Sequence, residues 1–170
     1  LKKQKCKRAL LLRKILPLVK KKLGKTQLWI ISDRVGRAQD NGEYLFRYLN
    51  AHPQPNIKAY FAISKNSPDF KRLKKYGKVL HIESLKYQIL FLASDVILSS
   101  LWGNSIEDPL GWHRDFVADL FNYKYVYLDH ALTKDDISED VNKHKRNFAM
   151  WTTAAQKETD SILKYPYGYS

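Results

Sequence analysis

Short apolar runs recur along the chain from residue 28 onward, and segments with helical periodicity separate them. The runs span residues 28–31, 57–63, 79–82, 96–98, 125–128 and 148–151. Their length and their β-branched and aromatic residues are typical of strands buried on both faces. Strands that alternate with helices predict a parallel sheet with helices on both faces. We therefore predict an α/β fold, a Rossmann-like parallel sheet of about six strands.

The helices expected between these strands follow from the spacing of apolar residues. Helical stripes begin at Glu43, Pro68 and Leu85, and the last one covers about residues 154–163. Another helix is expected near Phe116 after a long loop. The chain of 170 residues suits one such domain plus an appendage.

The appendage is a basic leader. Residues 1–25 carry eleven basic side chains and no acidic one, whereas the whole chain has 30 Lys+Arg, 17 Asp+Glu and a net charge of +13. The rest of the chain therefore has a net charge of only +2. This distribution argues against a domain that binds nucleic acid over a broad basic face. We expect a leader helix over residues 1–25 and a Rossmann-like domain over residues 26–170.

The leader has the periodicity of an amphipathic helix, which Pro17 is expected to kink or restart. Its apolar face comprises Leu12, Ile15, Leu16, Val19 and Leu23. Two interpretations stay open: the helix packs on the following domain, or it lies on an anionic membrane surface. In the second, the membrane-binding residues are Arg13, Lys14, Lys20, Lys21 and Lys22. No apolar stretch approaches the roughly 20 residues that a membrane span needs.

Polar residues follow several of the predicted strands, at the edge where open parallel sheets bind their ligands. Ser99 and Ser100 end the fourth strand, and Asp129 and His130 follow the fifth. A neutral imidazole at His130 could take a proton from a hydroxyl near neutral pH, which makes it the candidate general base. A hydrogen-bonded structural histidine is the alternative. If the strand pleat persists, Asp129 points to the opposite side and forms no relay with His130.

Candidate contacts for an anionic substrate lie in two loops. Arg34, Arg37 and Asn41 follow the first strand, and Lys134 follows His130. Thr133 and Asp136 have the spacing of a capping box, and the helix it predicts would place backbone donors near His130.

The motifs of NAD dehydrogenases, P-loop NTPases and zinc hydrolases are absent from the sequence. A single cysteine excludes an intrachain disulfide and a cysteine-rich zinc site. We expect neither a cofactor nor a metal.

Several segments, in the same order, resemble the CDP-glycerol glycerophosphotransferases, the teichoic acid primases and polymerases. They are residues 29–34 (WIISDR), 40–43 (DNGE), 77–79 (GKV), 84–87 (SLKY), 93–100 (ASDVILSS) and 128–136 (LDHALTKDD). The resemblance covers roughly residues 27–165. Within the last segment the family usually has Gln-His-Gly, where this chain has Asp129, His130 and Ala131.

The resemblance implies a GT-B architecture of two Rossmann-like domains, of which this chain would be the N-terminal, acceptor-side one. The C-terminal, donor-binding domain is missing from this chain, so the fragment alone is expected to be inactive. The implied reaction moves glycerol phosphate from CDP-glycerol to a hydroxyl of a lipid-linked or polymeric acceptor, glycerophosphate or glycan, in teichoic acid or capsule synthesis. The resemblance gives His130 the role of general base, and it places the enzyme peripherally at the cytoplasmic face of the cell membrane.

The departures at Asp129 and Ala131 leave other activities open. The chain could belong to a related GT-B enzyme that uses CDP-ribitol, another CDP-alditol or a nucleotide sugar. It could also be a non-catalytic, membrane-associated domain that kept the fold. A new carboxylate at Asp129 could repel a phosphate donor, and replacing glycine at position 131 removes conformational freedom.

Overall fold

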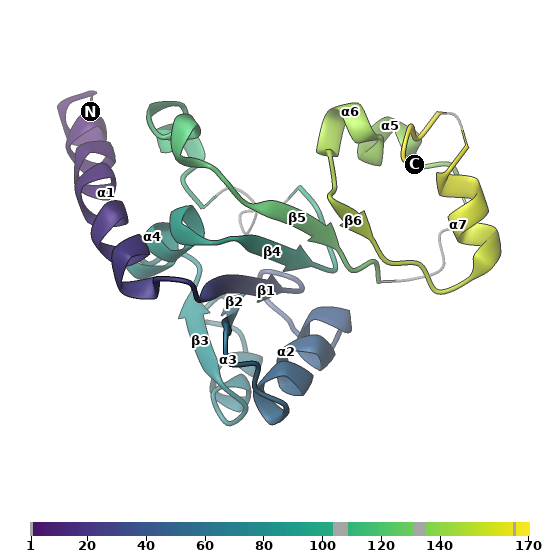
Figure 1. The fold of residues 1–170 in the computed structure, drawn as a ribbon, viewed down its shortest axis with the longest axis horizontal. Helices are drawn as coiled ribbons and strands as arrows, with labels where there is room; N and C mark the ends of the chain where they lie inside the picture. The colour runs from purple at the N-terminus through teal and green to yellow at the C-terminus, as the bar shows by residue number, and fades with distance from the viewer. Residues whose placement is uncertain (1, 104–108, 131–134, 165) are drawn as a thin grey trace.

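In the computed structural model, six parallel strands form one sheet in the order β3-β2-β1-β4-β5-β6 (Figure 1). The structure describes residues 2–103, 109–130, 135–164 and 166–170. The strands are β1 Gln27–Ser32, β2 Ile57–Ile63, β3 Lys78–His81, β4 Val96–Ser99, β5 Lys124–Tyr127 and β6 Met150–Trp151. The helices are α1 Lys2–Leu23, α2 Asn41–Ala51, α3 Asp69–Leu73, α4 Leu85–Ala93, α5 Ser138–Val141, α6 Lys143–Arg146 and α7 Gln156–Ile162, with 3-10 helices η1 Gly111–Phe116 and η2 Ala118–Leu120.

This strand order confirms the predicted α/β, Rossmann-like fold. The chain moves outward from β1 to β3, then returns to the other side of β1 with β4 and continues to β6. The order therefore reverses between β1 and β4, and doubly wound sheets bind ligands in the crevice at such a switch point. All five pairings are parallel, so the carboxyl ends of the strands meet at one edge.

The side chains of alternate residues in β1 point to opposite faces of the sheet, as the pleat of a strand requires. Leu28 and Ile30 pack in the clusters that contain α1 and α4, whereas Ile31 packs with Phe46 of α2 and Leu73 of α3. All five side chains are buried. Figure 1 shows α1 and α4 on one side of the sheet and α2 and α3 on the other.

Helix α1 packs its predicted apolar face on the domain. Leu12 and Leu16 are buried in a cluster with Leu92 of α4 and Val117, and the helix continues through Pro17. The Arg13 guanidinium forms an ion pair with Asp119 and donates to the Phe116 carbonyl. The interpretation that the leader packs on the following domain is thus confirmed. Among the described residues, no helix is both long and apolar enough to cross a bilayer.

The structure differs from the sequence-based elements mainly after β4. The helix expected near Phe116 is a pair of 3-10 helices, η1 and η2. The short helices α5 and α6 were not predicted, because each has only four residues and no periodicity to detect. They lie with β6 and α7 at the far end of the sheet (Figure 1), around an aromatic cluster that includes Tyr127, Phe148 and Tyr167.

Candidate functional site

The switch point, between the carboxyl ends of β1 and β4, is built around the buried carboxylate of Asp33, which directly follows β1. Asp33 accepts hydrogen bonds from the backbone N–H groups of Asp40, Gly42 and Glu43 at 2.8–3.2 Å. It also accepts one from the Ser100 hydroxyl at 2.8 Å. One side chain thereby joins the end of β1, the start of α2 and the end of β4.

Burial raises the pKa of Asp33 to about 6, and the hydrogen bonds from Ser100 and the backbone of Asp40 and Gly42 act in the opposite direction. These donors matter for the function of α2. The Asn41 N–H donates to the side chain of Asp40, and Gly42 and Glu43 donate to Asp33, so the first amides of α2 already donate to carboxylates of the protein. Unlike many helix N-termini, this one has no free amides to offer a phosphate.

Ser99 and Ser100, predicted as substrate contacts, are both fully buried. The Ser99 hydroxyl donates to the Leu101 carbonyl at 2.7 Å, and the Ser100 hydroxyl donates to Asp33. In this conformation neither hydroxyl reaches a ligand. Both lie at the carboxyl edge of the sheet, as the sequence predicted, but their hydrogen bonds make them part of the scaffold of this edge.

Arg34 and Arg37 lie exposed in the loop between β1 and α2. The Arg34 N–H donates to the Arg37 carbonyl, which closes a tight turn and keeps the two residues together. An ion-paired network holds the end of this loop. The buried Glu43 accepts from the Gln39 N–H at 2.8 Å and forms an ion pair with Arg72, which lowers the pKa of Glu43. The loop thus carries two exposed cationic side chains on an anchored backbone, directly after the carboxyl end of β1.

Asn41 connects this loop to the residues after β5. Its side-chain amide donates to the carbonyls of Leu128 and Asp129 at 3.2 and 3.1 Å. Both amide hydrogens are therefore used by the protein, and the amide oxygen is the group left for a ligand. Asn41 was predicted as a substrate contact, and the structure shows that it also positions the turn that carries His130.

His130 lies at the carboxyl end of β5, with its side chain 27% exposed. Strand β5 ends at Tyr127, and Asp129 has a left-handed backbone with φ 55°. The pleat that would have separated Asp129 from His130 does not extend this far, so the premise of that expectation is wrong, but the carboxylate still makes no direct hydrogen bond to the imidazole. The Asp129 carboxylate accepts from the His130 N–H at 2.7 Å and lies 4.0 Å from the ring nitrogen Nδ1.

Aromatic residues that were not predicted as site residues surround His130, and two of them donate hydrogen bonds to Asp129, while the Trp102 ring lies 6.5 Å from the imidazole. The Tyr127 hydroxyl donates to Asp129 at 3.1 Å and lies 3.4 Å from His130 Nδ1. The indole N–H of Trp151, on β6, donates to the other oxygen of Asp129 at 3.1 Å. Asp129 is 6% exposed. Its carboxylate is thus directed into hydrogen bonds with the protein.

The remaining candidate near His130 lies outside the described residues. Lys134 and the Thr133 end of the proposed capping box fall in the segment 131–134. Beyond that segment, Asp136 accepts from the Ser138 N–H at 2.9 Å, at the start of the four-residue helix α5.

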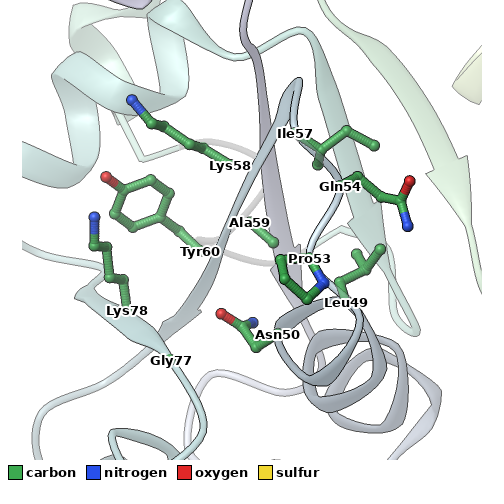
Figure 2. A pocket seen from close by; sticks show the side chains of 10 residues that line it. All are labelled: Leu49, Asn50, Pro53, Gln54, Ile57, Lys58, Ala59, Tyr60, Gly77 and Lys78. Carbon is green, nitrogen blue, oxygen red and sulfur yellow. The ribbon is translucent and has the colours of Figure 1, made fainter.

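A separate cavity of about 290 Å³ lies at the opposite edge of the sheet, where β2 and β3 begin (Figure 2). Leu49, Pro53 and Ile57 line one side of it, and Lys58 and Lys78 flank the other. It contains none of the predicted site residues. Because ligands of open parallel sheets bind at the carboxyl ends of the strands, we place the candidate site in the switch-point crevice. The described residues contain no cluster of three metal-ligating side chains.

Comparisons with known proteins agree with the resemblance noted in the sequence. A model of the CDP-glycerol:poly(glycerophosphate) glycerophosphotransferase family matches residues 14–170. The minor teichoic acid biosynthesis protein GgaB of Bacillus subtilis (strain 168) is 37% identical over 142 residues, which are 84% of this chain. The chain spans 16% of the length of GgaB.

Proposed function

The chain belongs to the CDP-glycerol:poly(glycerophosphate) glycerophosphotransferase family, and from this membership we propose that it is the acceptor-side domain of a transferase in teichoic acid synthesis. The enzyme moves glycerol phosphate from CDP-glycerol to a hydroxyl of a lipid-linked or polymeric acceptor. A second Rossmann-like domain of the longer protein completes a GT-B architecture and binds most of the donor.

The observation that carries this proposal is the placement of His130. It is half-buried and follows β5, the strand next to the edge strand β6, at the carboxyl edge of the sheet. The protein contacts its backbone N–H and its ring nitrogen Nδ1. Within the described part of the chain, the other ring nitrogen, Nε2, has no hydrogen-bond partner. A histidine fixed on one side and open on the other has the arrangement that a general base requires.

The proposed step is a displacement at phosphorus. The acceptor hydroxyl oxygen forms a bond to the phosphorus that carries glycerol, and the bond from that phosphorus to the bridging oxygen breaks. CMP leaves with the bonding electrons, and the hydroxyl proton passes to Nε2 of His130. The negative charge of the transferring phosphoryl group attracts cationic side chains, and Arg34, Arg37 and Lys134 are the proposed contacts.

Transfer by the full-length enzyme tests this assignment. CMP release is measured with CDP-glycerol, CDP-ribitol and a nucleotide sugar as donors, for wild type, His130→Ala and the control His52→Ala. His52 is exposed and follows α2 at the opposite edge of the sheet. We expect CDP-glycerol to be the preferred donor and the His130 variant to lose roughly 10²- to 10⁴-fold in kcat. Wild-type turnover in that variant would remove His130 as the base, and a preference for another donor would reassign the substrate.

We further propose that α1 holds the enzyme at the cytoplasmic face of the membrane through the side that does not pack on the domain. At 100° per residue, one side of the helix presents three exposed leucines among lysines. These residues are Lys7, Leu10, Leu11, Lys14, Leu18, Lys21 and Lys22. Leucines interspersed with lysines suit the boundary between anionic headgroups and acyl chains. Lys20 projects elsewhere on the helical wheel, and the ion pair of Arg13 with Asp119 makes it a weaker membrane contact than predicted.

Sedimentation of the full-length protein with vesicles of phosphatidylcholine and phosphatidylglycerol tests the membrane proposal. Each replacement of Lys14, Lys21 or Lys22 by Gln should remove about 1 kcal/mol of membrane-binding free energy. The triple variant should therefore bind the vesicles roughly 100-fold more weakly. The control replaces the exposed Lys65, Lys71 and Lys75, which removes the same charge from the domain body. Equal losses in the two triple variants would show that net charge, and not the α1 surface, drives binding. Added salt should weaken wild-type binding.

A further inference from the structure

Behind His130 lies a connected set of hydrogen bonds that the transfer reaction alone does not explain. The Trp151 indole and the Tyr127 hydroxyl donate to different oxygens of Asp129, each at 3.1 Å. The Tyr127 oxygen also lies 3.4 Å from His130 Nδ1. Tyr127 ends β5 and Trp151 ends β6, so two neighbouring strands fix the set from the sheet side.

The direction of each hydrogen bond follows from what the groups can donate. An ionised carboxylate only accepts, and Asp129 accepts from Tyr127, Trp151 and the His130 N–H. The one hydrogen of the Tyr127 hydroxyl is therefore directed to Asp129. Burial and the Asp129 carboxylate raise the pKa of Tyr127 well above its usual value, so the phenol stays neutral.

With its hydrogen directed to Asp129, the Tyr127 oxygen presents only lone pairs to the imidazole. A hydrogen bond between them then requires a hydrogen on Nδ1, and in a neutral imidazole that leaves Nε2 unprotonated. The hydrogen bond made by one ring nitrogen generally decides which nitrogen is free to react.

We propose that Tyr127 and Asp129 are positioning residues that hold neutral His130 as the Nδ1–H tautomer, with Nε2 as its proton-accepting atom. The backbone supports the same arrangement. Asp129 is in the left-handed region with φ 55°, a conformation that Asp tolerates better than most residues. Asn41 holds the turn from the other side through the Leu128 and Asp129 carbonyls. That Nε2 serves transfer rests on the proposed function, whereas the tautomer is a property of the protein alone.

Nitrogen NMR of the full-length protein, labelled with ¹⁵N-histidine, measures the tautomer without any turnover. Long-range proton–nitrogen correlations distinguish the protonated ring nitrogen from the unprotonated one, and the signals missing from His130→Gln assign the residue. We expect wild-type His130, in its neutral form, to carry its hydrogen on Nδ1. In Tyr127→Phe the acceptor oxygen is lost, and the Nε2–H form should become predominant.

Tyr125→Phe is the matched control, because it removes a hydroxyl from the same strand. That hydroxyl donates to the Leu101 carbonyl at 3.0 Å. The control should keep the Nδ1–H form. An Nε2–H form in the wild type, or an unchanged tautomer in a folded Tyr127→Phe variant, would overturn the inference. A variant that failed to fold would be replaced by Asp129→Asn, whose side chain can turn its NH2 group toward Tyr127 and so no longer fixes the hydroxyl hydrogen away from the imidazole. The Nδ1–H fraction should then fall, and an unchanged tautomer in this variant would overturn the inference.

The kinetics separate this inference from the proposed function. Tyr127→Phe should lower kcat about 5- to 10-fold, as expected for one net hydrogen bond, with an unchanged KM for CDP-glycerol. A higher KM for CDP-glycerol with kcat unchanged would contradict a positioning role. The proposed function would fail if His130→Ala transferred glycerol phosphate as fast as wild type. That result is independent of the tautomer that NMR measures.

Discussion

Replacing Asp33 by Ala should disrupt the crevice more than any other single carboxylate change we consider. Its carboxylate, fully buried, accepts three backbone N–H groups and the Ser100 hydroxyl. Alanine leaves four donors without acceptors, of which three are buried and the Asp40 N–H is part-buried, and each buried one costs about 1–3 kcal/mol. Water that enters the vacated space, and relief from burying a charge, offset part of this cost. We expect a net loss of about 3–5 kcal/mol.

Hydrogen exchange of the full-length enzyme, measured by mass spectrometry, reports the loss of stability in the segment around Asp33. In a peptide covering residues 33–51, the exchange protection should fall between roughly 100-fold and several thousand-fold. The matched control is Asp119→Ala, because the ion pair between Asp119 and Arg13 is exposed. An exposed pair contributes at most about 1 kcal/mol. If Asp33→Ala reduced the protection no more than Asp119→Ala does, the hydrogen bonds of Asp33 to α2 and β4 would not stabilise this region as we infer.

Two further changes test the same region. The ion pair with Arg72 lowers the pKa of Glu43 in the folded protein below its unfolded value of 4.5. The stability that this pair adds is therefore present above pH 4.5 and is lost as the pH falls through the lowered pKa. In Glu43→Gln, unfolding free energies from urea denaturation at pH 7 and pH 3.5 should differ less than in wild type; an equal difference would contradict this. Gly42→Ala would place its Cβ 2.5 Å from the Ser32 carbonyl oxygen, and we expect a loss of about 1–3 kcal/mol. Thermal unfolding should show no comparable loss for Gly36→Ala, which meets nothing within 4 Å.

The sequence predicted the sheet well because each buried strand is a short apolar run. The run at 57–63 matches β2 residue for residue, and all six strands fall within two residues of their predicted positions. Helix α2 begins before Glu43, because Asp33 and Asp40 cap it from residues that lie outside the periodic stripe. Capping by side chains from the loop that precedes the helix leaves no signal in hydrophobic periodicity.

The site was predictable in position but not in the role of each residue. Because ligands bind at the carboxyl ends of parallel strands, the sequence selected Ser99, Ser100 and His130, but this rule could not say which of them face a ligand. The role of Asp129 depended on where β5 ends, because one left-handed residue redirected its carboxylate toward Tyr127. Trp151 was assigned to a strand, and only the pairing of β5 with β6 places its indole beside Asp129.

Chemical rescue of the His130→Ala variant tests the central claim most directly. CMP release from CDP-glycerol is followed in the full-length enzyme while free imidazole is added in increasing concentration. If His130 is the base, the variant should be nearly inactive, and imidazole should restore turnover in a concentration-dependent manner without affecting wild type. Wild-type turnover in the variant before any imidazole is added would contradict the claim.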